Sequence, residues 1–287
     1  MAAMAVRDVV MPTRPAVRPD AVRPGAVRPG LEPNATLTAR IDLTASIARF
    51  IVRPDDGVGV FEPGQYFALG LTVDDRPLLR PYSTSSGRGT RSELEFLIRL
   101  VPDGAFTPRL WALRIGDRLR IGRAKGLFTL DPGDPRTHLF VATGTGLAPC
   151  LSMLESLIRD DAERPVGSGA AGAASASPRA IIVHGVSRVD ELAYRDRLER
   201  LASDRSDVRY APVVSRPADP ASAGWMGLTG RLDVGLGRIC DTHGLEPARS
   251  VAYICGNPEM ITAAREILAE GGFSPAAIVS EQYWPIG

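Results

Sequence analysis

The chain has 287 residues, of which 44% are hydrophobic and 23% charged, and its formal net charge is +1. This length favours two domains, and the balanced charge argues against nucleic acid or an anionic membrane surface as a partner. The three cysteines, Cys150, Cys240 and Cys255, are far apart and form no CxxC pair, which argues against a disulfide framework, a zinc site or a built-in iron–sulfur cluster.

Residues 1–33 are interpreted as a disordered extension. Ala-Val-Arg-Pro occurs three times in it, and the repeated prolines block both helix and sheet. The arginine-rich, acid-poor composition is typical of transit peptides, but these prolines oppose the amphipathic helix that such peptides form. No apolar run of the chain is long enough to span a membrane. We therefore expect a cytoplasmic protein without membrane insertion, and a monomer.

From Ala35 onward the pattern changes to short runs rich in Val, Ile, Leu, Thr and aromatic residues, bounded by turn residues. We expect strands at 36–43, 46–53, 65–73, 79–83, 94–100 and 117–121, and a short helix at 105–113. Short strands in this density with a single helix predict a closed antiparallel β-barrel domain, with bounds 34–133.

After a Pro- and Gly-rich turn at 131–135 the pattern alternates between strand and helix. We expect strands at 138–142, 180–185, 208–214 and 251–255, and helices at 149–159, 189–202, 232–242 and 258–270. Such alternation predicts a parallel sheet with helical crossovers, an α/β domain with bounds 134–287. Residues 167–178 are nearly all Gly, Ala and Ser, which favours a mobile surface insertion.

Two glycine-containing turns follow strands of this second domain. The first reads Gly-Thr-Gly-Leu-Ala-Pro at 144–149, and its glycines would let the backbone approach a pyrophosphate at a helix N-terminus. Because Pro149 replaces the third glycine of the usual fingerprint, a plain strand–turn–helix stays open. The second reads Cys-Gly-Asn-Pro-Glu-Met at 255–260, and a simple helix entry with Asn257 as cap is an alternative. Ligands bind at the carboxyl ends of such strands, so the two turns predict one crevice.

The run Arg80-Pro81-Tyr82-Ser83 ends a strand of the first domain. An arginine can pair with a diphosphate, a tyrosine can stack on a flat ring, and a serine hydroxyl can hydrogen-bond a ring nitrogen. Taken singly, each residue favours an ordinary exposed strand.

The order of the motifs changes that interpretation, because together they resemble the ferredoxin–NADP reductase family, in particular its bacterial branch. The resemblance covers roughly residues 35–284. It is carried by Arg80-x-Tyr82-Ser83, Phe96-Leu97-Ile98-Arg99, Gly104-x-x-Thr107, the turns at 144–149 and 255–260, and Glu281-Gln282-Tyr283-Trp284. The chain departs from the family pattern by continuing past Trp284 with three further residues.

The resemblance implies a two-domain fold, with an antiparallel β-barrel that binds FAD followed by an α/β parallel-sheet domain that binds NADP(H). It implies FAD contacts from barrel residues and from the C-terminus: Arg80, Pro81, Tyr82, Ser83, Phe96, Leu97, Ile98, Val101, Gly104, Thr107 and Trp284. It implies nucleotide contacts from Thr143, Thr145, Gly146 and Gly256.

The catalytic residues that the resemblance implies are Ser83, Cys255, Glu281 and Tyr283. Cys255 would stand beside the hydride path, and Glu281 would close a polar corner near the flavin. Tyr283 would stack on the isoalloxazine ring where the nicotinamide enters. The alternative is a C-terminal strand whose aromatic residues pack in an interdomain core.

Three arginines bear on the choice of nucleotide: Arg188, Arg216 and Arg231. By the resemblance they surround the 2′-phosphate of NADP, and no acidic residue follows the second strand immediately, as NAD binding would favour. The alternative is the general arginine excess of the chain, whose only lysine is Lys125.

The implied activity is hydride transfer from NADPH to FAD, followed by release of electrons to an acidic ferredoxin or flavodoxin. Arginines of the barrel domain are candidates for docking such a partner: Arg76, Arg88, Arg91, Arg109, Arg114, Arg118, Arg120 and Arg123. Two alternatives stay open. One is the NAD(P)H-dependent reductase component of an oxygenase, or a flavin reductase; the other is a non-catalytic FAD-binding electron-transfer subunit.

Overall fold

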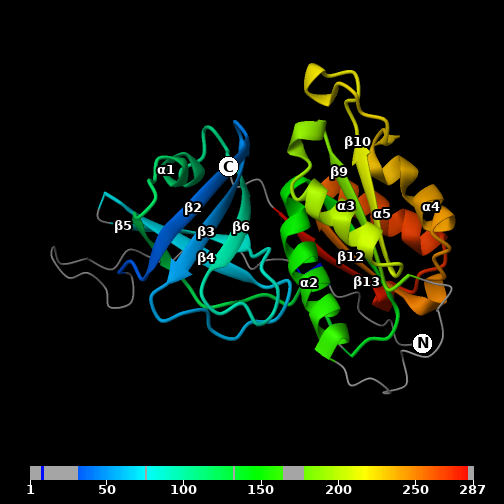
Figure 1. Cartoon of the computed structure of the whole chain (residues 1–287), viewed down its shortest axis with the longest axis horizontal. Coiled ribbons are helices and arrows are strands. Elements are labelled where there is room, and N and C mark those ends of the chain that lie inside the picture. The colour runs from blue at the N-terminus through cyan, green and yellow to red at the C-terminus, as the bar shows by residue number, and fades with distance from the viewer. Residues whose placement is uncertain (1–7, 10–31, 75, 132, 164–177, 284–287) are drawn as a thin grey trace.

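The computed structural model describes residues 8–9, 32–74, 76–131, 133–163 and 178–283, which form two lobes side by side (Figure 1). A six-stranded sheet makes the first lobe, and a seven-stranded sheet flanked by helices makes the second. Most of the N-terminal extension, most of the Gly/Ala/Ser insertion and Trp284 lie outside the described residues. No helix of the described ranges is long and apolar enough to cross a membrane.

The first lobe is the antiparallel barrel that the sequence predicts. Its strands are β2 (Ala35–Thr44), β3 (Ile47–Pro54), β4 (Tyr66–Val73), β5 (Arg76–Ser83), β6 (Leu94–Arg99) and β7 (Arg118–Ile121), in the order β5-β4-β7-β2-β3-β6. A bridge between Thr84 and Phe96 joins the two outer strands, and the Ser85 N–H donates to the Glu95 carbonyl at 2.8 Å. These contacts close the barrel where the chain leaves β5 and passes β6.

Apolar and polar residues alternate along the barrel strands, and the inward-facing apolar side chains fill the interior of the barrel. Phe50, Leu69 and Phe96 are fully buried in it. Each such side chain contributes roughly 1.5–3 kcal/mol through burial. The short helix α1 (Thr107–Trp111) covers one end, with the Trp111 ring 4.9 Å from that of Phe50.

The second lobe contains an all-parallel sheet. Its order is β1-β13-β12-β8-β9-β10-β11, from β1 (Asp8–Val9), β8 (Thr137–Thr143), β9 (Ala180–Val186), β10 (Val208–Val214), β11 (Leu228–Thr229), β12 (Ser250–Gly256) and β13 (Ile278–Gln282). The central strands β9 and β12 are buried along their whole length and β8 up to Ala142, as is typical of sheets covered on both faces.

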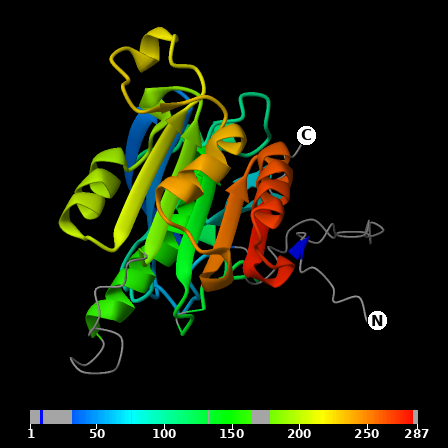
Figure 2. The ribbon, with the colours of Figure 1, turned by 90° about the vertical axis from the view of Figure 1, so that its right-hand side faces the viewer.

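Helices cover the two faces of this sheet in pairs. Helices α2 (Leu147–Glu163) and α3 (Arg195–Asp204) pack on one face, and α4 (Leu232–Thr242) and α5 (Pro258–Glu270) on the other, as Figure 2 shows. The neighbouring strands β8 and β12 therefore continue to opposite faces, into α2 and α5 respectively. Such a divergence opens a crevice at the carboxyl ends of the two strands.

The predicted helix 189–202 is wrong in its first half. A short 3-10 turn, η2 (Val189–Glu191), comes first, and α3 begins only at Arg195. Between them Tyr194 has φ = 58°, in the left-handed region that interrupts a right-handed helix. A C-terminal strand was considered only as an alternative for the terminal motif, and β13 is such a strand. The predicted bounds of α5 are confirmed.

Candidate functional site

The two glycine turns meet in the crevice between β8 and β12. A Cβ on Gly146 would lie 2.4 Å from the Cys255 carbonyl oxygen, so only glycine allows this approach. Gly256 has φ = 134°, and a Cβ there would lie 2.2 Å from the Thr143 hydroxyl oxygen. That hydroxyl accepts the Asn257 N–H at 2.9 Å, which ties the second turn to the end of β8.

The second turn is also a helix entry. The Asn257 side chain accepts the N–H groups of Glu259 at 2.9 Å and Met260 at 3.3 Å, and Pro258 occupies the first helical position. The capping interpretation is confirmed. It is compatible with a ligand role, because the same residues line the cleft described next.

An open cleft of about 530 Å³ lies over these turns. It is a suitable size for part of a dinucleotide. Its wall includes residues from both lobes: Arg99, Thr143, Gly144, Thr145, Gly185, Val186, Ser187, Glu191, Ser215, Gly230, Arg231, Leu232, Asp233, Gly256, Asn257, Pro258, Glu259, Met260 and Tyr283. A closely packed glycine cradle, backbone N–H groups and cations together fit a phosphorylated nucleotide.

The three candidate phosphate arginines lie at or near this cleft. Arg231 lines it, is 59% exposed and pairs with Asp233 at 3.1 Å. Arg188 pairs with Glu191 at 3.0 Å and with Asp190 at 3.4 Å. Arg216 is exposed at the end of β10, where its N–H donates to the Ser187 carbonyl at 2.9 Å. The ends of β9 and β10 thus bring Arg188 and Arg216 into one corner of the molecule.

A polar contact joins the lobes beside the cleft. The Ser83 hydroxyl donates to Oε2 of Glu281 at 3.3 Å, and both residues are buried. The other oxygen, Oε1, has no hydrogen-bond partner among the described residues. Burial raises the pKa of the Glu281 carboxyl to about 7, and the Ser83 hydrogen bond opposes the shift. An unpartnered carboxylate oxygen in a buried position indicates a place for a further polar group.

Cys255 and Tyr283 complete this corner. Burial, and next the nearby Glu281, raise the pKa of the Cys255 thiol well above its ordinary value, so the thiol stays neutral. Tyr283 lines the cleft, and its N–H donates to the Gly256 carbonyl at 3.4 Å. Burial also raises the pKa of its phenol, with contributions from Cys255 and Glu281. The residues predicted to be catalytic, Ser83, Cys255, Glu281 and Tyr283, therefore lie together.

The remaining residues of the barrel motif have different surroundings. The Tyr82 ring is half-buried with its centroid 5.7 Å from that of Phe106, and burial raises the pKa of its phenol. Arg80 donates to the Leu79 carbonyl at 2.9 Å and has no carboxylate partner within the described ranges. Pro81 is half-buried between them. Among the described residues, Arg80 is thus a cation without a counter-ion, close to the half-buried Tyr82 ring.

The turn at 101–107 is held by one hydroxyl. Thr107 accepts the Val101 N–H at 2.9 Å and donates to the Val101 carbonyl at 3.1 Å. The Gly104 N–H donates to the same carbonyl at 2.9 Å. Because its hydrogen bonds are used within the turn, Thr107 shapes this loop, and contacts with a diphosphate would come from backbone groups.

Three predicted cofactor contacts have buried side chains. Phe96 and Ile98 point into the barrel core, and Leu97 packs in the cluster around α2. Any contact of these residues with FAD would come from their main chain.

Sequence reasoning missed Arg99 and Glu191 as cleft residues and Tyr194 and Ser85 as interdomain contacts. Arg99 belonged to a matched motif, but no local pattern distinguishes it from other arginines. Tyr194 and Ser85 meet only through the tertiary fold.

Comparisons with known proteins agree with this geometry. Models of an oxidoreductase FAD-binding domain and an oxidoreductase NAD-binding domain match residues 34–130 and 140–266. The chain is 34% identical over 215 residues to ferredoxin–NADP reductase B of Sorangium cellulosum, covering 75% of this chain and 82% of that protein. It is 33% identical over 226 residues to ferredoxin–NADP reductase of Pseudomonas aeruginosa, covering 74% and 80%. A ferredoxin NADP+ reductase from Neisseria gonorrhoeae, solved with bound FAD and NADP, superposes with a TM-score of 0.71 at 25% identity, covering 88% of this chain and 98% of that one.

Proposed function

The chain belongs to the ferredoxin–NADP reductase family, and on that premise we propose that it is an FAD-dependent enzyme that passes electrons between NADPH and a ferredoxin or flavodoxin. The observation that carries the proposal is the contact of Ser83 with Glu281 at 3.3 Å, beside the nucleotide cleft that Tyr283 lines. Through it, a motif of the barrel and the nucleotide turns of the sheet share one site.

On the barrel side, we assign FAD to Arg80, Tyr82 and Ser83. Arg80 has no carboxylate partner in the described part of the chain, which leaves its guanidinium for a diphosphate. FAD, when bound, supplies a ring that takes a hydride from a reduced nicotinamide and releases its electrons singly. The Tyr82 ring and the main chain of the turn at 101–107 would form the wall of that site.

On the sheet side, we assign the nucleotide to Thr145, Gly146 and Gly256. Two glycines without Cβ atoms let backbone N–H groups come close to phosphate oxygens. Arg188, Arg216 and Arg231 would hold the 2′-phosphate, because guanidinium groups form charge-assisted bonds with phosphate. This supports NADP over NAD as the nucleotide.

Glu281 would hold and release the proton that accompanies the hydride chemistry. With a pKa of about 7, its carboxyl exchanges a proton near neutral pH. The Ser83 hydroxyl occupies Oε2, which leaves Oε1 for proton exchange. Cys255, neutral and fully buried, would shape the nicotinamide pocket without acting as a nucleophile. The Tyr283 side chain would cover the isoalloxazine ring of FAD until the nicotinamide enters.

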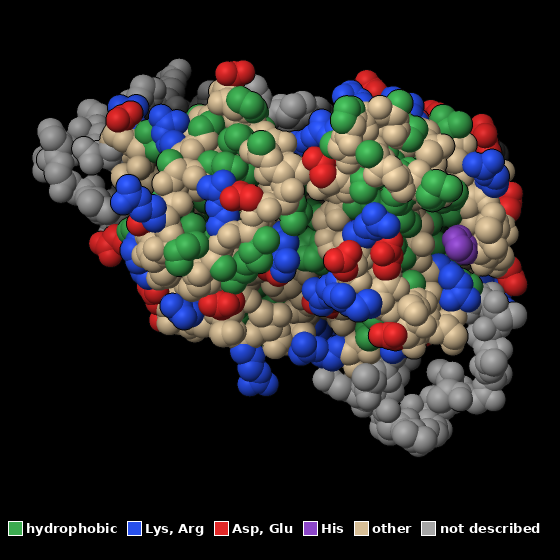
Figure 3. Space-filling view, turned by 45° about the horizontal axis from the view of Figure 1, so that its top comes forward, with side chains coloured by type: hydrophobic (Ala, Val, Ile, Leu, Met, Phe, Trp, Pro, Cys, Tyr) green, Lys and Arg blue, Asp and Glu red, His purple; other side chains and the backbone are tan. Residues whose placement is uncertain are grey.

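The acceptor is the finer part of the proposal. Arg109, Arg118 and Arg120 line a second cleft, of about 500 Å³, which β4, β5, β7 and α1 surround and which Asp74 also lines. These three cations could bind an acidic partner protein. The sequence alone could not show that they share one face. Arg118 is already paired with Asp55. Figure 3 shows the Lys and Arg side chains distributed over both lobes of the face in view, so attraction would be local rather than global.

A ferredoxin, a flavodoxin and free flavin, offered separately to the NADPH-reduced protein, test the acceptor. We expect the two proteins to be reduced, at a rate that falls as salt screens the opposite charges. Reduction of free flavin alone would favour the flavin-reductase alternative instead.

A further inference from the structure

One face of β6 points out of the barrel toward the other lobe. Phe96 and Ile98 are buried inside the barrel, so Glu95, Leu97 and Arg99 alternate with them on the opposite face. Leu97 belongs to the buried cluster of the second lobe, which also contains Ala193 and Tyr194. This face of β6 therefore adjoins the segment 187–194.

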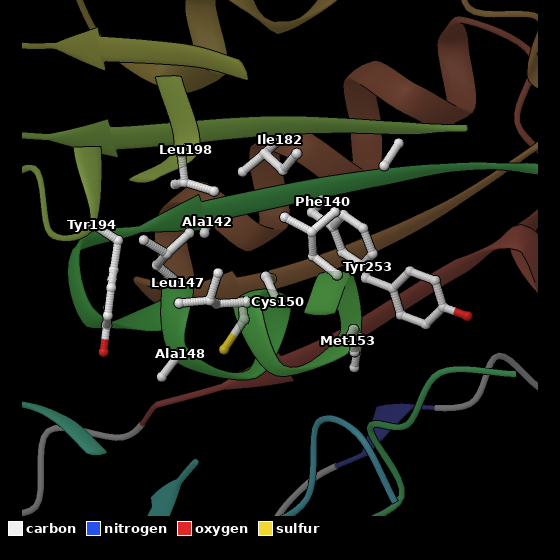
Figure 4. Packing of buried hydrophobic residues seen from close by; sticks show 14 of the residues in the cluster. Phe140, Ala142, Leu147, Ala148, Cys150, Met153, Ile182, Tyr194, Leu198 and Tyr253 are labelled. Carbon is white, nitrogen blue, oxygen red and sulfur yellow. The ribbon is translucent and has the colours of Figure 1, made fainter. Parts of the chain in front are cut away.

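Tyr194 binds one end of this face. Its hydroxyl donates to Oε1 of Glu95 at 2.5 Å and lies 2.9 Å from the Ser85 hydroxyl. The Arg49 guanidinium lies 4.8 Å from the centre of the Tyr194 ring and pairs with the same Glu95. In Figure 4 the Tyr194 ring extends from the cluster around Ala142 and Leu147 with its hydroxyl pointing away from Leu198. A side chain of the nucleotide lobe is thus embedded in a polar pocket of the barrel.

The backbone of Tyr194 supports a specific role for these contacts. Its φ of 58° is unfavourable for a residue with a bulky side chain. Residues in such conformations persist only where surrounding contacts hold them. Tyr194 is 9% exposed and Ser85 is 2% exposed, so the contact between their hydroxyls is shielded from competing water.

The other end of the segment is tied to Arg99. Its guanidinium pairs with Oε2 of Glu191 at 3.3 Å, and Oε1 of Glu191 pairs with Arg188 at 3.0 Å. The Ser187 N–H also donates to Glu191, at 3.3 Å. Ser187, Glu191 and Arg99 line the nucleotide cleft. Two residues of β6 therefore hold both ends of a segment that forms one wall of that cleft.

We propose that Tyr194 is a positioning residue for hydride transfer, whose hydroxyl fixes the nucleotide-binding segment 187–194 to the FAD barrel. The inference rests on the proposed function, since it concerns the distance between two cofactors held by different lobes. Hydride transfer requires reacting atoms about 3–3.5 Å apart, and a shift of about 1 Å can lower the rate about a hundredfold. A rigid tie between β6 and this segment would maintain that distance.

Tyr194→Phe removes the hydroxyl and keeps the ring. We expect the rate of flavin reduction at saturating NADPH to fall about three- to tenfold and the KM for NADPH to rise, as for loss of a buried hydrogen bond. FAD content and the flavin spectrum should stay unchanged. Tyr253→Phe is the matched control, because Tyr253 belongs to the same buried cluster and is not among the described residues that line the cleft, and it should behave as the unaltered protein.

Ser85→Ala tests the same contact from the barrel and remains informative if Tyr194→Phe folds poorly. We expect the effects of the two substitutions on the reduction rate to be non-additive, because both remove one shared contact. Fully additive effects, or a Tyr194→Phe protein with a normal rate and KM, would overturn the positioning role. If NADPH does not reduce even the unaltered protein, the proposed function fails; a normal rate with an inert Tyr194→Phe substitution overturns the further inference alone.

Discussion

The Ser83 hydroxyl lies 3.3 Å from the carboxylate of Glu281, joining the last residue of β5 to β13 across 198 positions of sequence. The contact makes the barrel and the parallel sheet two walls of one site. The buried carboxyl of Glu281 and the glycine turns at 144–149 and 255–260 lead to predictions that can be measured.

The first prediction concerns pH. The pKa of Glu281 is raised by burial to about 7 from an ordinary 4.5, so between these values the folded chain keeps a proton that the unfolded chain has released. Stability from this group is present below about pH 4.5 and is lost as pH rises toward about 7, by up to about 3 kcal/mol. Denaturant unfolding across this range should show that Glu281→Gln removes this decline. Glu246→Gln, which changes a side chain that is 59% exposed, is the control. An unchanged slope in Glu281→Gln would contradict the buried-carboxyl account.

The second prediction concerns the nucleotide. Arg188→Ala and Arg216→Ala should each raise the KM for NADPH about tenfold or more, with little effect on that for NADH, since a charge-assisted bond to the 2′-phosphate is lost. Arg188→Ala should raise the KM for NADPH more than Arg216→Ala does, because it leaves the buried Glu191 with Arg99 as its remaining arginine partner among the described residues. Adding Glu191→Gln to Arg188→Ala should lower this KM part of the way back. Equal effects on NADPH and NADH in steady-state kinetics would argue against a phosphate pocket.

The third prediction concerns the contact between the glycine turns. In Gly146→Ala the new methyl group would lie 2.4 Å from the Cys255 carbonyl oxygen, which forces the turns apart. We expect a loss of about 1–3 kcal/mol in the free energy of unfolding, as for other overpacked sites, and weaker nucleotide binding. Gly59→Ala is the control, because a Cβ there meets nothing within 4 Å. Equal midpoint temperatures of thermal unfolding for Gly146→Ala and Gly59→Ala would mean that the two turns can move apart without loss of stability.

The fourth prediction concerns Tyr283. If its side chain must leave before the nicotinamide enters, Tyr283→Ser should bind NADP+ about tenfold more tightly, because a competing state is removed. Tyr283→Phe, which keeps an aromatic ring, should bind as the unaltered protein does. Titration of the oxidised flavoprotein with NADP+ measures both. Equal affinities for the two variants would mean that the ring does not cover the site.

Local chemistry explains why much of the fold could be predicted from the sequence. Asn257 and Pro258 carry a cap and a first-turn signal within two residues, and the helix that follows has the predicted bounds. The barrel strands likewise follow from alternation and turn residues. The family motifs named Glu281 and three residues that gather around it, Ser83, Cys255 and Tyr283.

The errors arise where tertiary contacts override local pattern. The helical periodicity of 189–202 continues through Tyr194, but the tyrosine turns toward Ser85 and Glu95 of the other lobe and breaks the helix. No spacing rule relates residues 109 and 99 positions apart. The sequence likewise could not place Arg99 in the nucleotide cleft, since this position depends on how the two lobes meet.

Anaerobic addition of NADPH to the purified, FAD-loaded protein tests the central claim most directly. The account predicts that the protein retains FAD and that NADPH rapidly bleaches the flavin absorption, with NADH much slower at equal concentration. A protein that cannot be loaded with FAD, or a flavin that NADPH leaves oxidised, would contradict it.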